Sequence, residues 1–206
     1  MEREMETLDY YNRNAEAYSQ STRDIDFHKI QEHFLRDLPE KGLILDFGCG
    51  SGRDSRHFLD RGFRVEAVDG SKALCRIAEA YIGQPVRQML FQELSEDSRY
   101  DGIWACSSIL HLSKDDLLSV FQRISRALRM GGILYTSFKY GTFSGMRDGR
   151  FFTDMTEESF NIFLTGVPEL RITESWVSAD LRPGREKERW LNLLLRKTGG
   201  YGESVQ

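Results

Sequence analysis

Residues Leu43–Ser55 read LILDFGCGSGRDS and carry the strongest structural signal in the chain. The segment begins with a short apolar run that predicts a buried strand. Glycines follow at alternate positions, where they tolerate positive φ and let the backbone approach a ligand closely. Helical spacing resumes at residues 57–59. The segment therefore predicts strand, glycine loop and helix, the arrangement that places a helix N-terminus beside a bound nucleotide.

The spacing of the glycines separates two kinds of nucleotide loop. A dinucleotide loop has the pattern G-x-G-x-x-G, and its third glycine would fall at position 53, where this chain has Arg53. The chain instead places Asp46 at the strand end, followed by Gly48, Gly50 and Gly52. A carboxylate at that point is unfavourable beside a pyrophosphate. It suits a ligand that carries an amine or a sulfonium.

The pattern D-x-G-x-G-x-G resembles the cofactor loop of class I S-adenosylmethionine-dependent methyltransferases. The longer segments GCGSGRDS and GFRVEAVDGS resemble the small bacterial branch that includes tellurite-resistance and thiopurine methyltransferases. The resemblance implies an α/β, Rossmann-like, doubly wound fold. Its seven-stranded sheet would be mostly parallel, with an antiparallel C-terminal hairpin. The alternative is a glycine-rich turn without a ligand.

Length and composition restrict the class of protein. The 206 residues are enough for one α/β domain, and a net charge of -4 argues against a nucleic-acid footprint. The start of the chain has no apolar run, and no segment reaches the roughly 18 apolar residues of a membrane span. The three cysteines show no C-x-x-C spacing, which predicts reduced thiols in a cytoplasmic protein without disulfides or a metal site.

Residues 1–38 are expected to form a helical arm, interrupted by a polar loop at 19–23. In the resembled family such an arm covers the cofactor. The family pattern Y-x-x-x-A-x-x-Y is matched by Tyr11, Ala15 and Tyr18. The resemblance makes the two tyrosines candidate cofactor contacts, and the alternative is ordinary packing.

A second expected strand, 63–68, ends at Asp69. An acid at this strand end accepts hydrogen bonds from ribose hydroxyls, a device that NAD-binding proteins share. Asp69 or Ser71 is alternatively the N-cap of a helix expected over 72–81. A third strand is expected at 85–89. By resemblance, Phe91 and Gln92, just after it, are candidate contacts for the adenine ring of the cofactor. The candidate cofactor contacts are Tyr11, Tyr18, Asp46, Gly48, Cys49, Gly50, Gly52, Asp69, Gly70, Ser71, Phe91, Gln92 and Ser107.

A fourth expected strand, 101–106, delivers Ser107 and His111 to the same crevice, because ligands lie outside the carboxyl ends of parallel strands. Ser107 is expected to line the cofactor pocket. His111 is the candidate catalytic base, since imidazole accepts a proton near neutral pH. The alternative is a histidine that packs or caps.

After a fifth strand at 133–138, the polar segment 139–154 is expected to be a substrate loop, since a long loop in a compact domain is usually functional. Lys139, Tyr140, Arg147 and Arg150 are candidate contacts for an acidic or phosphate-bearing substrate. The alternative is a solvated loop. A charged connection at 182–189 is expected to be solvated as well.

Together these features predict a single-domain cytoplasmic methyltransferase that uses S-adenosylmethionine, binds no membrane and acts on a small-molecule acceptor. No N-P-P-Y motif follows the fourth strand. That motif would indicate methylation of the amino groups of bases or of glutamine. Three alternatives remain open: an RNA methyltransferase, an NAD-dependent oxidoreductase and a non-catalytic scaffold that binds the cofactor. The sequence leaves the acceptor atom and the oligomeric state undetermined.

Overall fold

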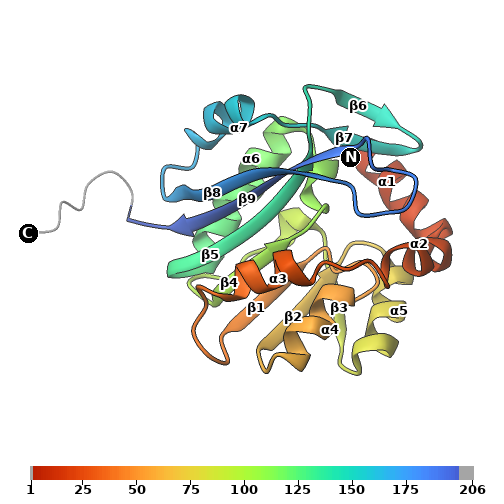
Figure 1. Ribbon diagram of the computed structural model, residues 1–206, viewed down its shortest axis with the longest axis horizontal. Helices are drawn as coiled ribbons and strands as arrows, with labels where there is room; N and C mark the ends of the chain where they lie inside the picture. Colours follow the sequence, from red (N-terminus) through yellow and green to blue (C-terminus); the bar gives the residue numbers. More distant parts are fainter. Residues whose placement is uncertain (1, 200–206) are drawn as a thin grey trace, which may run out of the picture.

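The computed structural model describes residues 2–199, which form one central sheet with helices on both faces (Figure 1). The strands are β1 (Leu43–Phe47), β2 (Arg64–Asp69), β3 (Val86–Gln88), β4 (Tyr100–Ala105), β5 (Leu128–Lys139), β6 (Ser144–Arg147), β7 (Arg150–Thr153), β8 (Leu170–Ala179) and β9 (Arg189–Lys197). The α-helices are α1 (Glu2–Arg13), α2 (Ala15–Thr22), α3 (His28–Leu35), α4 (Arg53–Asp60), α5 (Lys72–Ile82), α6 (Lys114–Ala127) and α7 (Glu157–Leu164). Two short 3-10 turns are η1 (Phe91–Glu93) and η2 (Ile109–His111).

The seven-stranded sheet has the order β3-β2-β1-β4-β5-β9-β8. Strands β1 to β5 pair in parallel, whereas β9 runs antiparallel to both β5 and β8. This arrangement confirms the predicted doubly wound sheet with its antiparallel hairpin. The strand order reverses between β1 and β4, so a crevice opens at their carboxyl ends.

Both faces of the sheet are covered, which explains why the central strands β1 and β4 are buried along almost their whole length. In β1, Leu45 and Phe47 pack into the cluster that contains residues of α6 and α7. Ile44 points to the opposite cluster, which contains residues of α3, α4 and α5. The alternation follows from the period of two along a strand. No helix in the described part of the chain is both long and apolar enough to span a membrane.

The N-terminal arm differs from the prediction. Helix α2 continues to Thr22, so the loop expected at 19–23 is wrong, and the break falls after it, before α3. Polar side chains form bonds within the helix itself. The Thr22 hydroxyl donates to the carbonyl of Tyr18, and the Arg23 guanidinium donates to the buried Ser19 hydroxyl. Polar composition therefore did not indicate a loop here.

The segment 139–154 is also more regular than predicted, because it contains the two-stranded hairpin β6–β7. Arg147 pairs with Arg150 across a two-residue turn of Asp148 and Gly149, whose φ angles are 51° and 75°. Two consecutive positive φ values are typical of the type I′ turn that Asp-Gly favours. A structureless loop was therefore the wrong prediction for this segment.

Candidate functional site

The glycine loop follows β1 and leads into α4. Gly48 has a φ of +87°, and a Cβ added there would lie 2.5 Å from the Cβ of Ser108. Both its backbone conformation and the close approach of the loop after β4 therefore require glycine. The N–H groups of Gly48 and Cys49 both donate to the carbonyl of Val68 at 2.9 Å. These bonds fix the loop against the end of β2.

Asp69 connects the end of β2 to the glycine loop. One carboxylate oxygen accepts a hydrogen bond from the N–H of Gly50 at 2.9 Å, and the other accepts from the N–H of Ser71 at 2.8 Å. Burial raises the pKa of Asp69, and the two backbone donors oppose that rise. A carboxylate has about four acceptor positions. Asp69 therefore keeps capacity for the hydroxyls of a ligand.

Asp46 has a different environment from the one predicted. It is buried in β1, and the Ser55 hydroxyl of α4 donates to its carboxyl group at 2.5 Å. Burial, with a smaller contribution from the nearby carboxylate of Asp54, raises the pKa of Asp46 to about 8. Asp46 lines neither of the two cavities described below. Its position suits anchoring α4 to β1 rather than direct contact with a ligand.

An inner pocket lies between the glycine loop, the end of β2, the loop after β3 and the helical arm. The predicted residues that line it are Tyr11, Tyr18, Gly48, Gly50, Asp69, Gly70, Phe91, Ser107 and His111. The apolar residues that sequence reasoning missed are Leu8, Leu74, Met89, Leu90 and Leu112. An aromatic ring at 91 and these apolar side chains beside an aspartate suit a flat base attached to a ribose.

Four other predicted cofactor contacts lie outside the inner pocket. Gly52 begins α4 with a φ of +81°, and a Cβ there would meet Ile82 at 2.9 Å. Ser71 caps α5 through the N–H of Leu74. Gln92 donates to Glu4 of the arm at 2.8 Å. The fourth, Cys49, is buried and lines the outer cavity.

Tyr11 and His111 meet at the boundary of the inner pocket. The Nδ1 atom of His111 lies 2.6 Å from the carbonyl oxygen of Phe151, and a carbonyl can only accept, so Nδ1 carries the proton. In the neutral ring Nε2 is then the acceptor, and the Tyr11 hydroxyl donates to it at 2.8 Å. Burial lowers the pKa of His111 to about 4. The imidazole is therefore neutral at physiological pH.

An outer cavity of about 490 Å³ adjoins the inner pocket. All four predicted substrate contacts line it: Lys139, Tyr140, Arg147 and Arg150. Seven residues line both spaces: Tyr11, Tyr18, Gly48, Gly50, Cys106, Ser107 and His111. The junction of the two spaces is thus formed by the glycine loop, the segment after β4 and the tyrosines of the arm.

The basic residues of the outer cavity differ in their partners. Lys139 forms ion pairs with Glu188 and with Asp180, and burial lowers its pKa to about 8. Arg147 pairs with Asp154 at 2.9 Å. Arg150 makes no ion pair with any residue between 2 and 199 and stacks on the ring of Tyr10 at 4.4 Å. Among the predicted substrate contacts, Arg150 is therefore the basic residue whose charge remains available to a ligand.

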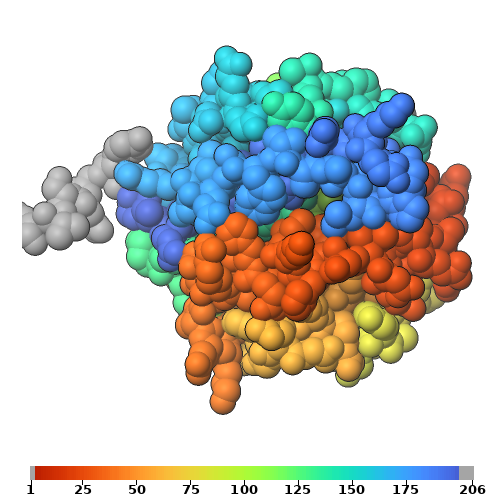
Figure 2. Space-filling view, viewed as in Figure 1, coloured from red at the N-terminus to blue at the C-terminus, as the bar shows by residue number. Residues whose placement is uncertain are grey.

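The connection between β8 and β9 forms part of the outer cavity, although its charge pattern had predicted a solvated loop. Asp180 accepts hydrogen bonds from Arg182 and from the indole N–H of Trp190. In Figure 2 this connection, in blue, meets the N-terminal arm, in red and orange, along one face of the molecule. Thr22 and Phe27 line the cavity from the arm side. No local sequence signal indicated this contact.

Comparison with known proteins places these features in a family context. Residues 44–132 match the family described as methyltransferase domain. The chain is 34% identical over 117 residues to N-terminal Xaa-Pro-Lys N-methyltransferase 1-B of Xenopus laevis, covering 52% of each chain. It is 30% identical over 141 residues to YqeM of Bacillus subtilis, provisionally assigned as a methyltransferase, covering 63% of this chain and 57% of the relative. The chain therefore spans about half the length of these relatives.

A solved structure shares the fold over nearly the whole chain. It is the 1,6-didemethyltoxoflavin-N1-methyltransferase of Burkholderia thailandensis, with bound 1,6-didemethyltoxoflavin and S-adenosylhomocysteine. The TM-score is 0.78 at 20% identity, over 96% of this chain and 89% of that one. The chain therefore has the class I methyltransferase fold, and the matched residues 44–132 include the glycine loop.

Proposed function

We propose that this chain, with its methyltransferase domain at 44–132, is an S-adenosylmethionine-dependent methyltransferase. The observation that carries the proposal is the inner pocket, in which the glycine loop and Asp69 are joined by a hydrogen bond. Asp69 binds the ribose hydroxyls, and Phe91 packs against the adenine. When bound, the cofactor supplies an activated methyl group on a sulfonium. The protein's contribution is to position the two reactants.

The junction between the two spaces is the proposed site of methyl transfer. Tyr11, Tyr18 and His111 are among its polar groups, and all three line both the inner pocket and the outer cavity. Because the pKa of His111 is about 4 and its Nε2 already accepts from Tyr11, this imidazole is a weak base. A nucleophile with an available lone pair, such as a thiolate or a ring nitrogen, needs no strong base. In that case His111 orients Tyr11 against the acceptor.

The proposed acceptor is a small molecule with an anionic group. The cavity volume of about 490 Å³ suits such a molecule. Arg150 supports the assignment because it faces the cavity without an ion-pair partner among the described residues, and a guanidinium can bind a carboxylate or phosphate through two parallel hydrogen bonds. The cytoplasmic location and the tellurite-resistance or thiopurine branch remain predictions from the sequence.

A second candidate acceptor is the terminal amine of a protein. It is favoured by the 34% identity to an N-terminal Xaa-Pro-Lys N-methyltransferase. The cavity also contains carboxylates, among them Asp154 and Asp180, that a cationic terminus would approach. Both are engaged by arginines, which makes an anionic acceptor the first choice. Labelled methyl transfer to small anions and to short peptides distinguishes the two.

The cofactor assignment is tested by calorimetric titration with S-adenosylmethionine, S-adenosylhomocysteine and NAD. Wild-type protein should bind the first two, and Asp69→Ala should bind them at least tenfold more weakly. Asp97→Ala removes an exposed carboxylate remote from the pocket and serves as the control. Binding of NAD alone would favour an oxidoreductase instead. Cofactor binding without methyl transfer to any acceptor would favour a non-catalytic scaffold that binds the cofactor.

A further inference from the structure

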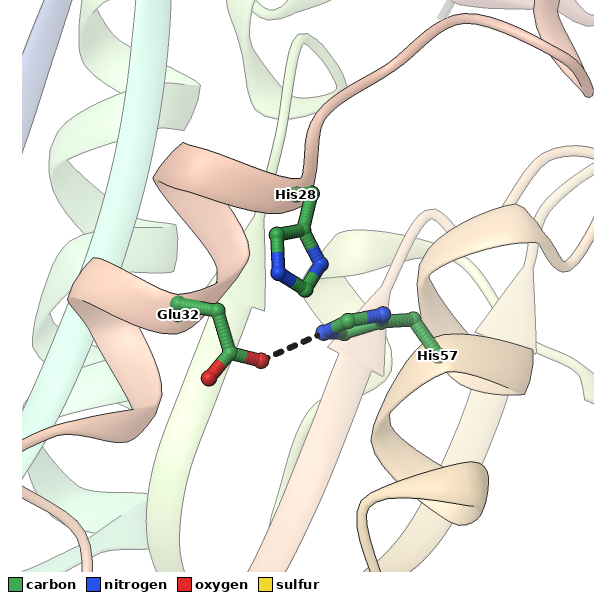
Figure 3. A group of neighbouring side chains, drawn as sticks. All are labelled: His28, Glu32 and His57. Atoms are coloured by element: carbon green, nitrogen blue, oxygen red, sulfur yellow. Dashed lines mark hydrogen bonds and ion pairs between the residues drawn. The ribbon is translucent and has the colours of Figure 1, made fainter.

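Three metal-ligating side chains meet between α3 and α4, outside both cavities (Figure 3). His28 and Glu32 stand four residues apart on α3, so they share one face of that helix. His57 projects from α4 toward them. One ligand atom of each residue lies within 4.8 Å of the other two. The group has no role in the proposed methyl transfer.

The carboxylate of Glu32 is held in a defined orientation. Its Oε2 atom forms an ion pair with Arg61 at 2.8 Å, and its Oε1 atom lies 3.0 Å from Nε2 of His57. One oxygen is thus fixed by an arginine and the other faces the histidines. Partners of this kind orient metal ligands in known sites. Glu32 and His57 are partly shielded, with 31% and 19% of their side chains exposed.

His28 completes the group from the solvent side. Its ring stands edge-on to that of His57, with the centroids 5.2 Å apart and the planes at 86°. The residue is exposed, so its ring has room to rotate. Zinc–nitrogen bonds are about 2.0–2.1 Å long. Side-chain rotation must therefore bring the three ligand atoms closer together, while the two helices stay in place.

We propose that His28, Glu32 and His57 bind a Zn²⁺ ion, with water in the fourth position. Two imidazoles and one carboxylate form an open ligand set that suits zinc. Calcium and magnesium prefer oxygen ligands and fit the group poorly. Binding replaces the hydrogen bond between Glu32 and His57 with two bonds to the ion, and the proton on Nε2 of His57 moves to Nδ1 or is released.

A bound ion would join the arm to the helix that follows the glycine loop. Gln31 of α3 already donates to the buried carboxylate of Asp54 in α4 at 2.6 Å. Phe27 and Ile30, on either side of His28, line the outer cavity. The metal would therefore hold this part of the arm against the domain and stiffen one wall of the cavity.

The test uses the metal-free full chain and does not depend on turnover. Zn²⁺ is titrated in competition with a chromophoric chelator, and Co²⁺ is added separately because its visible bands report the coordination geometry. We expect one ion per chain, tetrahedral Co²⁺ bands and slower amide exchange at 23–35 when Zn²⁺ is present. His28→Ala and His57→Ala should each weaken binding at least tenfold.

His33→Ala is the matched control, because His33 lies on the same helix but pairs with Glu174 and stacks on Trp176. It should bind Zn²⁺ as tightly as the wild type. Thermal unfolding of all variants without metal verifies that they fold. The proposal is overturned if folded wild-type protein binds no stoichiometric ion, or if His28→Ala and His57→Ala bind as well as His33→Ala does.

Discussion

The hydroxyl of Tyr11 donates a 2.8 Å hydrogen bond to Nε2 of His111, which lies 100 residues further along the chain. The pair connects α1 to the turn η2 that follows β4. A carbonyl of β7 fixes the other nitrogen of the ring. Three segments distant in sequence thus determine one imidazole orientation at the junction of the two spaces.

Removing the hydroxyl with Tyr11→Phe should destabilise the protein by about 1–3 kcal/mol, because the buried Nε2 acceptor of His111 loses its partner. Tyr10→Phe is the control, since no hydrogen bond of the Tyr10 hydroxyl is present in the described part of the chain. Urea unfolding of both variants measures the difference. Equal stabilities would show that the Tyr11 bond contributes nothing.

The neutral state of His111 predicts a pH dependence of stability. Its pKa is lowered from 6.5 to about 4 by burial, so the unfolded chain binds the proton more readily than the folded one. The stabilising effect is complete above about 6.5 and is lost as the pH falls toward 4, by on the order of 3 kcal/mol. Urea unfolding between pH 7 and pH 4.5 should show this loss in the wild type.

His111→Gln should lack that component of the pH profile. Asp46 acts in the opposite direction, because its raised pKa makes stability fall as the pH rises above its ordinary 3.8. Since Asp46 is present in both proteins, the difference between wild type and variant isolates the histidine. Parallel profiles for the two proteins would contradict the buried neutral imidazole.

Gly48→Ala should abolish cofactor binding and cost about 2–5 kcal/mol of stability. The strained φ contributes roughly 1–2 kcal/mol, and overpacking against Ser108 contributes roughly 1–3 kcal/mol. Gly62→Ala is the matched control, because Gly62 has a φ of +85° with no atom within 4 Å of the added Cβ. Gly62→Ala should lose only the roughly 1–2 kcal/mol of stability that comes from the strained φ. Thermal unfolding and calorimetry compare the two, and equal losses would contradict a role for close packing.

Arg150→Gln should raise the KM for an anionic acceptor about tenfold or more while leaving cofactor affinity within about twofold. The reason is the loss of a charged hydrogen bond, which is worth about 1.5–3 kcal/mol. Arg126→Gln, at an exposed position remote from both cavities, is the control. Steady-state kinetics with the identified acceptor measure the effect. An unchanged KM would exclude Arg150 from acceptor binding.

The positions of several elements followed from local patterns, whereas the arrangement of the sheet was implied by the family resemblance. Apolar runs, glycines at strand ends and helical spacing are encoded within short segments, so β2, α5, β3 and β4 were predicted within a residue or two. The turn at Asp148 and Gly149 was also encoded locally, and the Asp-Gly signal was overlooked. Polar bonding within α2 concealed a helix in a segment that composition had assigned to a loop.

The parts of the site that depend on distant packing were not predictable from one sequence. Nothing near Asp180 or Trp190 in the sequence indicates that their connection meets the arm. Asp46 matches the family pattern, but its burial beside Ser55 depends on how α4 docks on β1. Cysteine spacing, from which the sequence predicted no metal site, carries no information about His28 and His57, which the fold brings together from two helices.

The arm has a consequence for the order of events during turnover. Leu8 of α1 lies so close to the end of β2 that a Cβ added to Gly70 would be 2.7 Å from its side chain. Tyr11 and Tyr18 stand between the inner pocket and the outer cavity. The proposed cofactor, bound in the inner pocket, would therefore lie against the arm, and the acceptor would reach it from the outer cavity. Occupancy of the inner pocket should thus complete one wall of the acceptor site, so the cofactor is expected to bind before the acceptor.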